Sequence, residues 1–137
     1  MIWLRAFGVW LILMSVEVVH GALREAFLSP RVGGLRARQI TVFSGSLLLF
    51  AATWLFIRWI GARTRGSLLA VGILWLVLTV LFELGLGYFA FGRSRVELAG
   101  DFDPARGGLL PIGLVFLTLC PWIAARIRGL DATPPTR

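Results

Sequence analysis

Residues 66–92 read GSLLAVGILWLVLTVLFELGLGYFAFG, a stretch in which Glu83 is the one charged side chain. A helix needs about 17–25 mostly apolar residues to cross the roughly 30 Å hydrocarbon core of a bilayer. Because that core offers no water, the backbone must satisfy its own polar groups, as a helix does. This stretch therefore predicts a transmembrane helix.

Three further apolar runs of sufficient length lie between arginines. They are 6–23, whose one acidic residue is Glu17, and 39–57 and 107–125, which contain no Asp, Glu or Arg. The sequence therefore predicts an all-α membrane protein, with four transmembrane helices in one domain over residues 1–129.

Prolines and tryptophans add detail to these spans. Pro121 lies inside the last run and predicts a kink or an early break there. Five of the six Trp residues lie mostly toward span ends, as interfacial anchors would; these five are Trp10, Trp54, Trp59, Trp75 and Trp122. Residues 130–137 contain two prolines and no apolar periodicity, so we expect a disordered tail.

The composition supports lipid as the solvent. The chain of 137 residues is 58% hydrophobic and only 15% charged, and its mean hydropathy is +0.84. All fourteen basic residues are Arg and the net charge is +7, yet the arginines punctuate the chain between apolar runs instead of forming one patch. This distribution argues against nucleic acid as a partner and favours the anionic headgroups of the bilayer.

The sequence gives little support for metal, redox or cofactor chemistry. Cys120 is the only cysteine, so no intrachain disulfide or redox dithiol is possible. Glu17 and His20 match the Glu-x-x-His element of di-iron bundles, but such sites need two of these elements, and His20 is the only histidine. No cofactor or metal is therefore expected.

The two halves of the chain resemble each other. Glu17 and Gly21 align with Glu83 and Gly87 at a constant offset. A second block with its own constant offset pairs Gly45, Trp54, Arg58 and Gly61 with Gly113, Trp122, Arg126 and Gly129. These matches predict a 2+2 internal duplication, with repeat one at about 3–61 and repeat two at about 69–129. Because each unit has two spans, the repeats would be parallel, related by an axis along the membrane normal.

Two glutamates lie inside predicted spans. At 1.5 Å per residue, Glu17 lies about 10 Å below Arg24, and Glu83 about 15 Å below Arg93. A carboxylate there costs several kcal/mol unless it is paired or protonated. His20 and Arg24 share a helix face with Glu17, so we expect Glu17, His20, Arg24 and Glu83 to line a polar pocket open to the loop side. The alternative is purely structural pairing, such as Glu17 with Arg38 and Glu83 with Arg93.

The region between the first two spans is strongly basic. It contains Arg31, Arg36 and Arg38, for which we expect headgroup contact, or alternatively an anionic lipid or substrate site. Arginines are equally numerous at the two ends of the spans, so their count gives no orientation. The short loop 58–66 concentrates three of them, which favours both termini in the cytoplasm.

The whole chain resembles the small, Arg-rich, four-span inner-membrane proteins of bacteria, a resemblance that implies a location but no activity. Residues 12–21, ILMSVEVVHG, are similar to the first helix of the small multidrug resistance transporters. In that family one glutamate of this helix binds protons and cationic drugs, a role that the resemblance would give to Glu17. The family's aromatic Gly-x-Ala-Tyr-Ala-x-Trp pattern is missing from the third span, where Ile73–Gly87 instead carries a second glutamate.

Three functions fit these observations. The sequence favours a non-enzymatic subunit of a membrane complex, packed against other membrane proteins or itself, because it contains no evident catalytic constellation. The second is a small proton- or cation-coupled transporter that uses Glu17 and Glu83. The third is a membrane enzyme acting on lipid or quinone, with His20 as general base oriented by Glu17.

Overall fold

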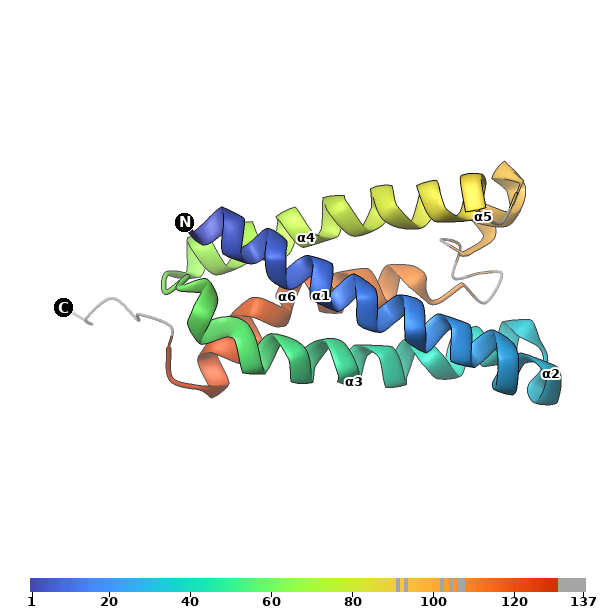
Figure 1. The fold of residues 1–137 in the computed structure, drawn as a ribbon, viewed down its shortest axis with the longest axis horizontal. Coiled ribbons are helices and arrows are strands. Elements are labelled where there is room, and N and C mark those ends of the chain that lie inside the picture. The colour runs from blue at the N-terminus through green and yellow to red at the C-terminus, as the bar shows by residue number, and fades with distance from the viewer. Residues whose placement is uncertain (91, 93, 102, 104, 106–107, 131–137) are drawn as a thin grey trace.

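The computed structural model describes residues 1–137 except 91, 93, 102, 104, 106–107 and 131–137. Four of its helices are long and apolar enough to cross a membrane, which confirms the predicted all-α fold of four spans. The helices lie alongside one another, with the start of the first long helix and the end of the last long helix at one end of the bundle (Figure 1). We call this the terminal end and the opposite one the loop end. The tail expected from residue 130 lies outside the described residues, apart from Leu130, whose amide donates to the Ala125 carbonyl.

Each half of the chain runs through the same order of elements: a long helix, a π-helical turn, a short helix and a second long helix. In the first half these are α1 (Ile2–Leu23), η1 (Arg24–Leu28), α2 (Ser29–Val32) and α3 (Gly34–Ile60). In the second half they are α4 (Arg65–Gly85), η2 (Leu86–Ala90), α5 (Arg95–Asp101) and α6 (Leu110–Ile127). The shared order fits the proposed duplication, which stays a prediction.

The basic region after the first span is helical. Helix α1, η1 and α2 together form a helical run of 31 residues from Ile2 to Val32. At 1.5 Å per residue this run is about 46 Å long, well beyond the roughly 30 Å of the hydrocarbon core. It ends at Gly33, whose φ of 89° is open to glycine and strained for other residues. The arginines of this region therefore lie on helical turns near the membrane surface.

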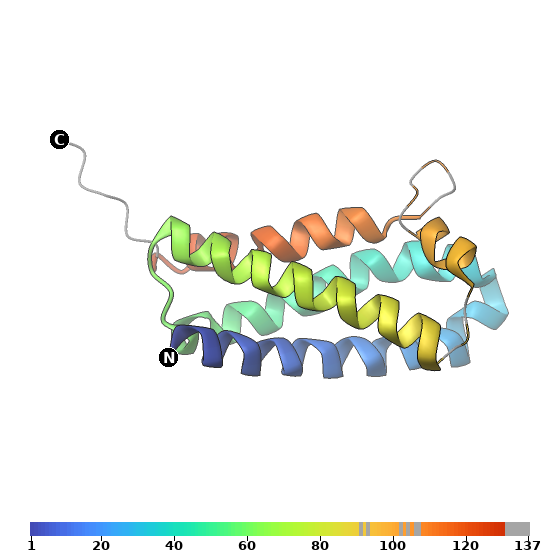
Figure 2. The ribbon, with the colours of Figure 1, turned by 90° about the horizontal axis from the view of Figure 1, so that it is seen from above.

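Helices α4 and α6 approach each other closely at Gly72. A Cβ atom built on Gly72 would lie 1.8 Å from the carbonyl oxygen of Thr118. Glycine is therefore required for this contact, as at many close crossings of membrane helices. Helix α6 continues through Pro121 to Ile127, so the alternative of an early break was wrong. The helix instead bends along its length (Figure 2).

Helices α1 and α4 are joined near the terminal end by two tryptophans. The indole N–H of Trp75 donates to the carbonyl of Ala6 at 2.9 Å, and that of Trp10 donates to the hydroxyl of Thr79 at 3.0 Å. Both Trp side chains are buried, so the expectation that they anchor the chain at the interface was wrong. A buried Trp needs a partner for its N–H, and here each helix supplies one for the other.

Three further tryptophans lie against arginines. The guanidinium of Arg128 lies over the ring of Trp54 at 4.3 Å, that of Arg5 over Trp59 at 5.7 Å, and that of Arg126 over Trp122 at 5.4 Å. These pairs lie in the last turns of α3 and α6 and the first turns of α1, at the terminal end of the bundle. Such cation–π pairs suit the membrane–water interface.

Candidate intramembrane polar site

A cavity of about 700 Å³ lies between the loop-end halves of the four long helices. Its wall includes all four residues expected at the polar site: Glu17, His20 and Arg24 from the first helical run, and Glu83 from α4. All four side chains are half-buried. Cavities of roughly 300–1,000 Å³ are the size that binds small molecules.

The three arginines between the first two spans differ in how exposed their side chains are. Arg38 is half-buried on the first turns of α3 and lines the cavity. Arg31 and Arg36 are exposed at the loop end. Arg38 therefore belongs with the cavity, whereas the other two side chains are free to contact headgroups.

The Glu17 carboxyl group projects toward α3, where Gly45 makes room for it. A Cβ atom on Gly45 would lie 3.1 Å from Oε1 of Glu17 and 3.4 Å from Cε1 of His20. Within the described residues, Glu17 Oε1 is buried and has no hydrogen-bond partner. The charged side chains that act on this carboxyl group are Glu83 and Arg24. Glu17 thus presents a buried acceptor atom to which none of the described residues donates a hydrogen bond.

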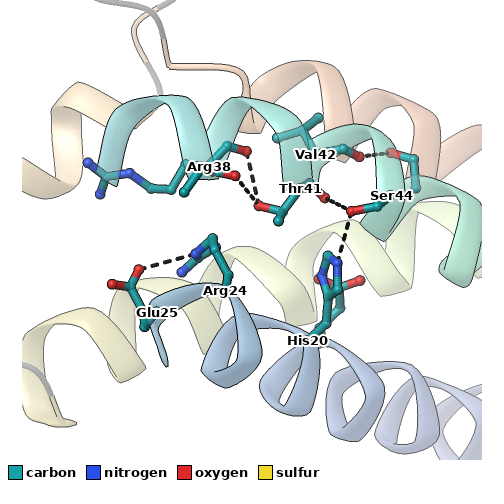
Figure 3. A network of polar contacts seen from close by, with 10 residues as sticks. His20, Arg24, Glu25, Arg38, Thr41, Val42 and Ser44 are labelled. Atoms are coloured by element: carbon teal, nitrogen blue, oxygen red, sulfur yellow. Dashed lines mark hydrogen bonds and ion pairs between the residues drawn. The ribbon is translucent and has the colours of Figure 1, made fainter. Parts of the chain in front are cut away.

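His20 connects Glu17 with α3. Its Nε2 shares a hydrogen bond of 2.9 Å with the hydroxyl of Ser44 (Figure 3). Its Nδ1 lies 3.9 Å from Oε2 of Glu17. Sequence reasoning missed Ser44, although Thr41, Ser44 and Ser46 form a short polar series within an otherwise apolar span. The contact fixes the imidazole between the two helices.

Ser44, His20 and Glu17 follow the order of a serine hydrolase triad but lack its geometry. The 3.9 Å between the imidazole and the carboxylate exceeds hydrogen-bond length. Ser44 also lies inside α3, where backbone N–H groups already donate to carbonyls four residues earlier and are not free to stabilise an oxyanion. The arrangement therefore offers little support for acyl-transfer chemistry.

Arg24 folds back along its own helix. Its Nε donates to Oε1 of Glu25 at 3.2 Å (Figure 3). One of its terminal nitrogens lies 3.9 Å from the position that a Cβ of Gly21 would take. The guanidinium therefore covers Gly21, one turn closer to Glu17 than its own Cα. A larger residue at Gly21 would crowd this position.

The structural alternative pairs each glutamate with an arginine. Its partner for Glu83, Arg93, lies outside the described residues. Glu83 and Arg38 do take part in interactions within the protein. The ion-pair interpretation therefore stays a hypothesis beside the binding-site interpretation.

The polar wall suits a cation better than a metal ion or an anion. Among the described residues, no three His, Cys, Asp or Glu side chains are grouped to hold a metal. The carboxylates of the wall are Glu17, Glu25 and Glu83, and its guanidinium groups are Arg24 and Arg38. Among the described wall residues, and when all are ionised, the carboxylates exceed the guanidinium groups by one, which favours a positively charged occupant.

Comparison with protein families, with curated proteins and with solved structures finds no match to this chain. Any function must therefore be argued from the site. The features available for that argument are the cavity, its charged wall and its place inside the membrane-spanning bundle.

Proposed function

We propose that this chain is a small membrane transporter, proton- or cation-coupled, with Glu17 and Glu83 as the groups that bind the cation. The observation that carries the proposal is the cavity of about 700 Å³ that has both glutamates in its wall. Charged groups facing a cavity within a membrane-spanning bundle typically mark an ion or substrate pathway.

The electrostatics of the wall explain why a cation would bind. Glu83 acts on Glu17 across the cavity, and like charges in a medium of low dielectric repel strongly. A proton or another cation between the two carboxyl groups relieves this repulsion. Arg24 offsets part of the negative charge, but Glu25 already pairs with that guanidinium at 3.2 Å.

The cavity favours transport over the subunit function that the sequence alone favoured. A subunit whose role is packing gains stability from filled, dry interfaces, and a polar cavity reduces that packing. Association with other membrane subunits or with itself stays a prediction beside transport.

We further propose a bacterial inner membrane with both termini in the cytoplasm. The location rests on the resemblance of the whole chain to Arg-rich four-span bacterial proteins. The orientation rests on the short connection between α3 and α4, which is flanked by Arg58, Arg63 and Arg65. Anionic lipids would contact the exposed Arg31 and Arg36.

A reporter active only outside the cytoplasm should stay silent when fused to the C-terminus; activity there would reverse the orientation.

The transport proposal is tested by proton flux in proteoliposomes. An imposed membrane potential should drive proton uptake, read with a pH-sensitive dye inside the vesicles. The double variant Glu17→Gln/Glu83→Gln should reduce this flux to that of empty vesicles, because neutral amides cannot carry the proton. Glu25→Gln, at the exposed rim of the same cavity, is the matched control and should keep most of the flux. Equal flux through the parent and the double variant, or no flux through either, contradicts the proposal.

A further inference from the structure

The fold gathers at the terminal end arginines that are spaced widely along the chain. They come from the first turns of α1 and α4, the last turns of α3 and α6, and the connections beside them; they are Arg5, Arg58, Arg63, Arg65, Arg126 and Arg128. No Asp or Glu among the described residues lies at this end. Along any of the long helices the nearest acidic residue is Glu17, about 18 Å from Arg5 at 1.5 Å per residue. Within the described residues, this positive surface therefore has no acidic side chain beside it.

Three of these guanidinium groups are held against the ends of α3 and α6. Arg5 donates to the carbonyl of Trp59 at 3.1 Å, and Arg128 donates to that of Trp54 at 2.6 Å. Arg126 lies over a tryptophan ring of its own helix. The protein itself thus uses part of the binding capacity of these three groups.

The other three guanidinium groups lack such contacts. Arg58 lies on the last turn of α3, Arg63 in the connection to α4, and Arg65 at the start of α4. All three are exposed, and within the described residues none of them forms a side-chain hydrogen bond or ion pair. A guanidinium group has five N–H donors in a planar fork that matches two oxygens of a phosphate. These three groups therefore offer unused donors to an external anion.

Exposed tryptophans place this surface at the depth of the lipid headgroups. The side chains of Trp3, Trp54 and Trp59 are 55%, 38% and 52% exposed, and all three lie within the two turns nearest the terminal end. Trp favours the boundary between hydrocarbon and headgroups because its ring is amphipathic. The negative surface charge of a bilayer at this depth comes from anionic lipids. A phospholipid headgroup therefore fits this surface better than an acidic soluble protein, which would have to approach through the headgroup region.

We propose that Arg58, Arg63 and Arg65 form a binding surface for the phosphate groups of anionic phospholipids in the leaflet at the terminal end. This surface is separate from the proposed transport site, because the cavity lies at the opposite end of the spans. At the loop end, Glu25 and Asp103 lie among the arginines and offset part of their charge. We therefore expect the terminal end to select anionic over zwitterionic lipids more strongly than the loop end does.

Quenching of tryptophan fluorescence by brominated lipids tests the proposal, because the exposed tryptophans lie at the same end as the three arginines. The full-length protein is placed in vesicles of phosphatidylglycerol and phosphatidylcholine, one of which has bromine near the glycerol end of its chains. Both headgroups contain a phosphate, but only phosphatidylglycerol has a net negative charge. We expect phosphatidylglycerol to be preferred at the protein about fivefold, the contribution of roughly one arginine near the membrane surface.

Paired variants locate this preference. Arg63→Gln/Arg65→Gln should reduce it to about twofold or less, and Arg63→Lys/Arg65→Lys should keep most of it because the positive charges remain. Arg31→Gln/Arg36→Gln is the matched control, since it removes the same charge from exposed positions at the loop end and should leave the quenching unchanged. Thermal unfolding of each variant in detergent shows that the protein remains folded.

Three results would overturn the inference. Equal quenching by the two lipids would mean that this surface does not select anionic headgroups, and its counter-charge would then have to come from another partner. A preference kept by Arg58→Gln/Arg63→Gln/Arg65→Gln would place the recognition elsewhere. Loss of the preference on addition of millimolar glycerol 1-phosphate would assign the surface to a soluble phosphate. The transport proposal is independent of all three results, because it is tested by flux through the glutamates.

Discussion

Helices α1 and α4 pack directly against each other toward the terminal end, and we call this part of the pair the closed half. Toward the loop end a cavity lies between them, and we call this part the open half. In the closed half, Trp10 and Trp75 fill the space between the helices, and each indole N–H finds an acceptor on the opposite helix. In the open half, Glu17 and Glu83 face a cavity, and one oxygen of Glu17 is buried without a partner among the described residues. The protein thus satisfies its own polar groups where the bundle is held together, and leaves hydrogen-bonding capacity unused where we place the ligand.

Breaking the tight contact between α4 and α6, which lies beside the closed half, should have the largest effect on stability. Gly72→Ala would bring a Cβ atom to 1.8 Å from the Thr118 carbonyl oxygen, and a backbone carbonyl cannot rotate away as a side chain does. We expect a loss of about 3 kcal/mol or more in the free energy of unfolding, the upper part of the range for overpacking. Gly85→Ala on the same helix has open space around it and should be nearly neutral. Unfolding in mixed micelles measures both, and a neutral Gly72→Ala would mean that α4 and α6 do not approach as described.

Removing one acceptor in the closed half should have a smaller but clear effect. Thr79→Val keeps the shape of the side chain but leaves the buried N–H of Trp10 without its acceptor, at a cost of about 1–3 kcal/mol. Thr41→Val is the control, because Thr41 is also buried but its hydroxyl donates to Ala37 of its own helix. The same unfolding assay should separate the two. Equal losses would argue that the indole contact contributes nothing beyond the burial of the threonine.

In the open half, a single methyl group should disturb binding more than folding. Gly45→Ala would place a Cβ at 3.1 Å from Glu17 Oε1, so the carboxyl group must shift away. Off-rotamer displacement of this kind costs about 0.5–1.5 kcal/mol, which corresponds to roughly a twofold to tenfold loss of cation affinity. Gly113→Ala lies at the aligned position in the second half and meets only Val42, at 3.8 Å. Its affinity should stay close to that of the parent, and a larger loss for Gly113→Ala than for Gly45→Ala would refute the placement of Glu17.

The smallest effect is expected for the hydrogen bond that ties His20 to α3. Ser44→Ala removes it, and side-chain hydrogen bonds between membrane helices contribute about 0.6 kcal/mol on average. Ser15→Ala removes only a bond to the carbonyl of Leu11 within α1 and should change stability less. A loss of several kcal/mol in the free energy of unfolding for Ser44→Ala would show that the contact between His20 and Ser44 is essential for the packing of α1 against α3.

The four spans could be predicted from the sequence because the hydrocarbon core imposes both a length and an absence of charge. Glu17, His20, Arg24 and Glu83 could be proposed as one site because charges in apolar runs are conspicuous. The roles of Trp10 and Trp75 could not, since position along a span does not tell whether a side chain faces lipid or a neighbouring helix.

Other features depend on how the helices pack in three dimensions. Gly72 reads as one glycine among many, and only the approach of α6 makes it essential. The contact between Ser44 and His20 joins residues that are 24 positions apart on different helices, and no local pattern predicts it. The helical course from Arg24 to Val32 was also missed, because Arg24 was taken to end the apolar span, although Arg is a good helix former.

Whether water reaches Glu17 is best measured by thiol chemistry at that position. In a Cys120→Ala background, Glu17→Cys would be exposed to a permanently charged, water-soluble thiosulfonate reagent, with Ile12→Cys on the lipid-facing surface of the same helix as the reference. Thiols react as thiolates, which form readily only where water is present. We expect Glu17→Cys to react many times faster than Ile12→Cys. Equal, slow reaction at both positions would mean that the loop-end half of the bundle is closed and dry, which contradicts an aqueous binding cavity.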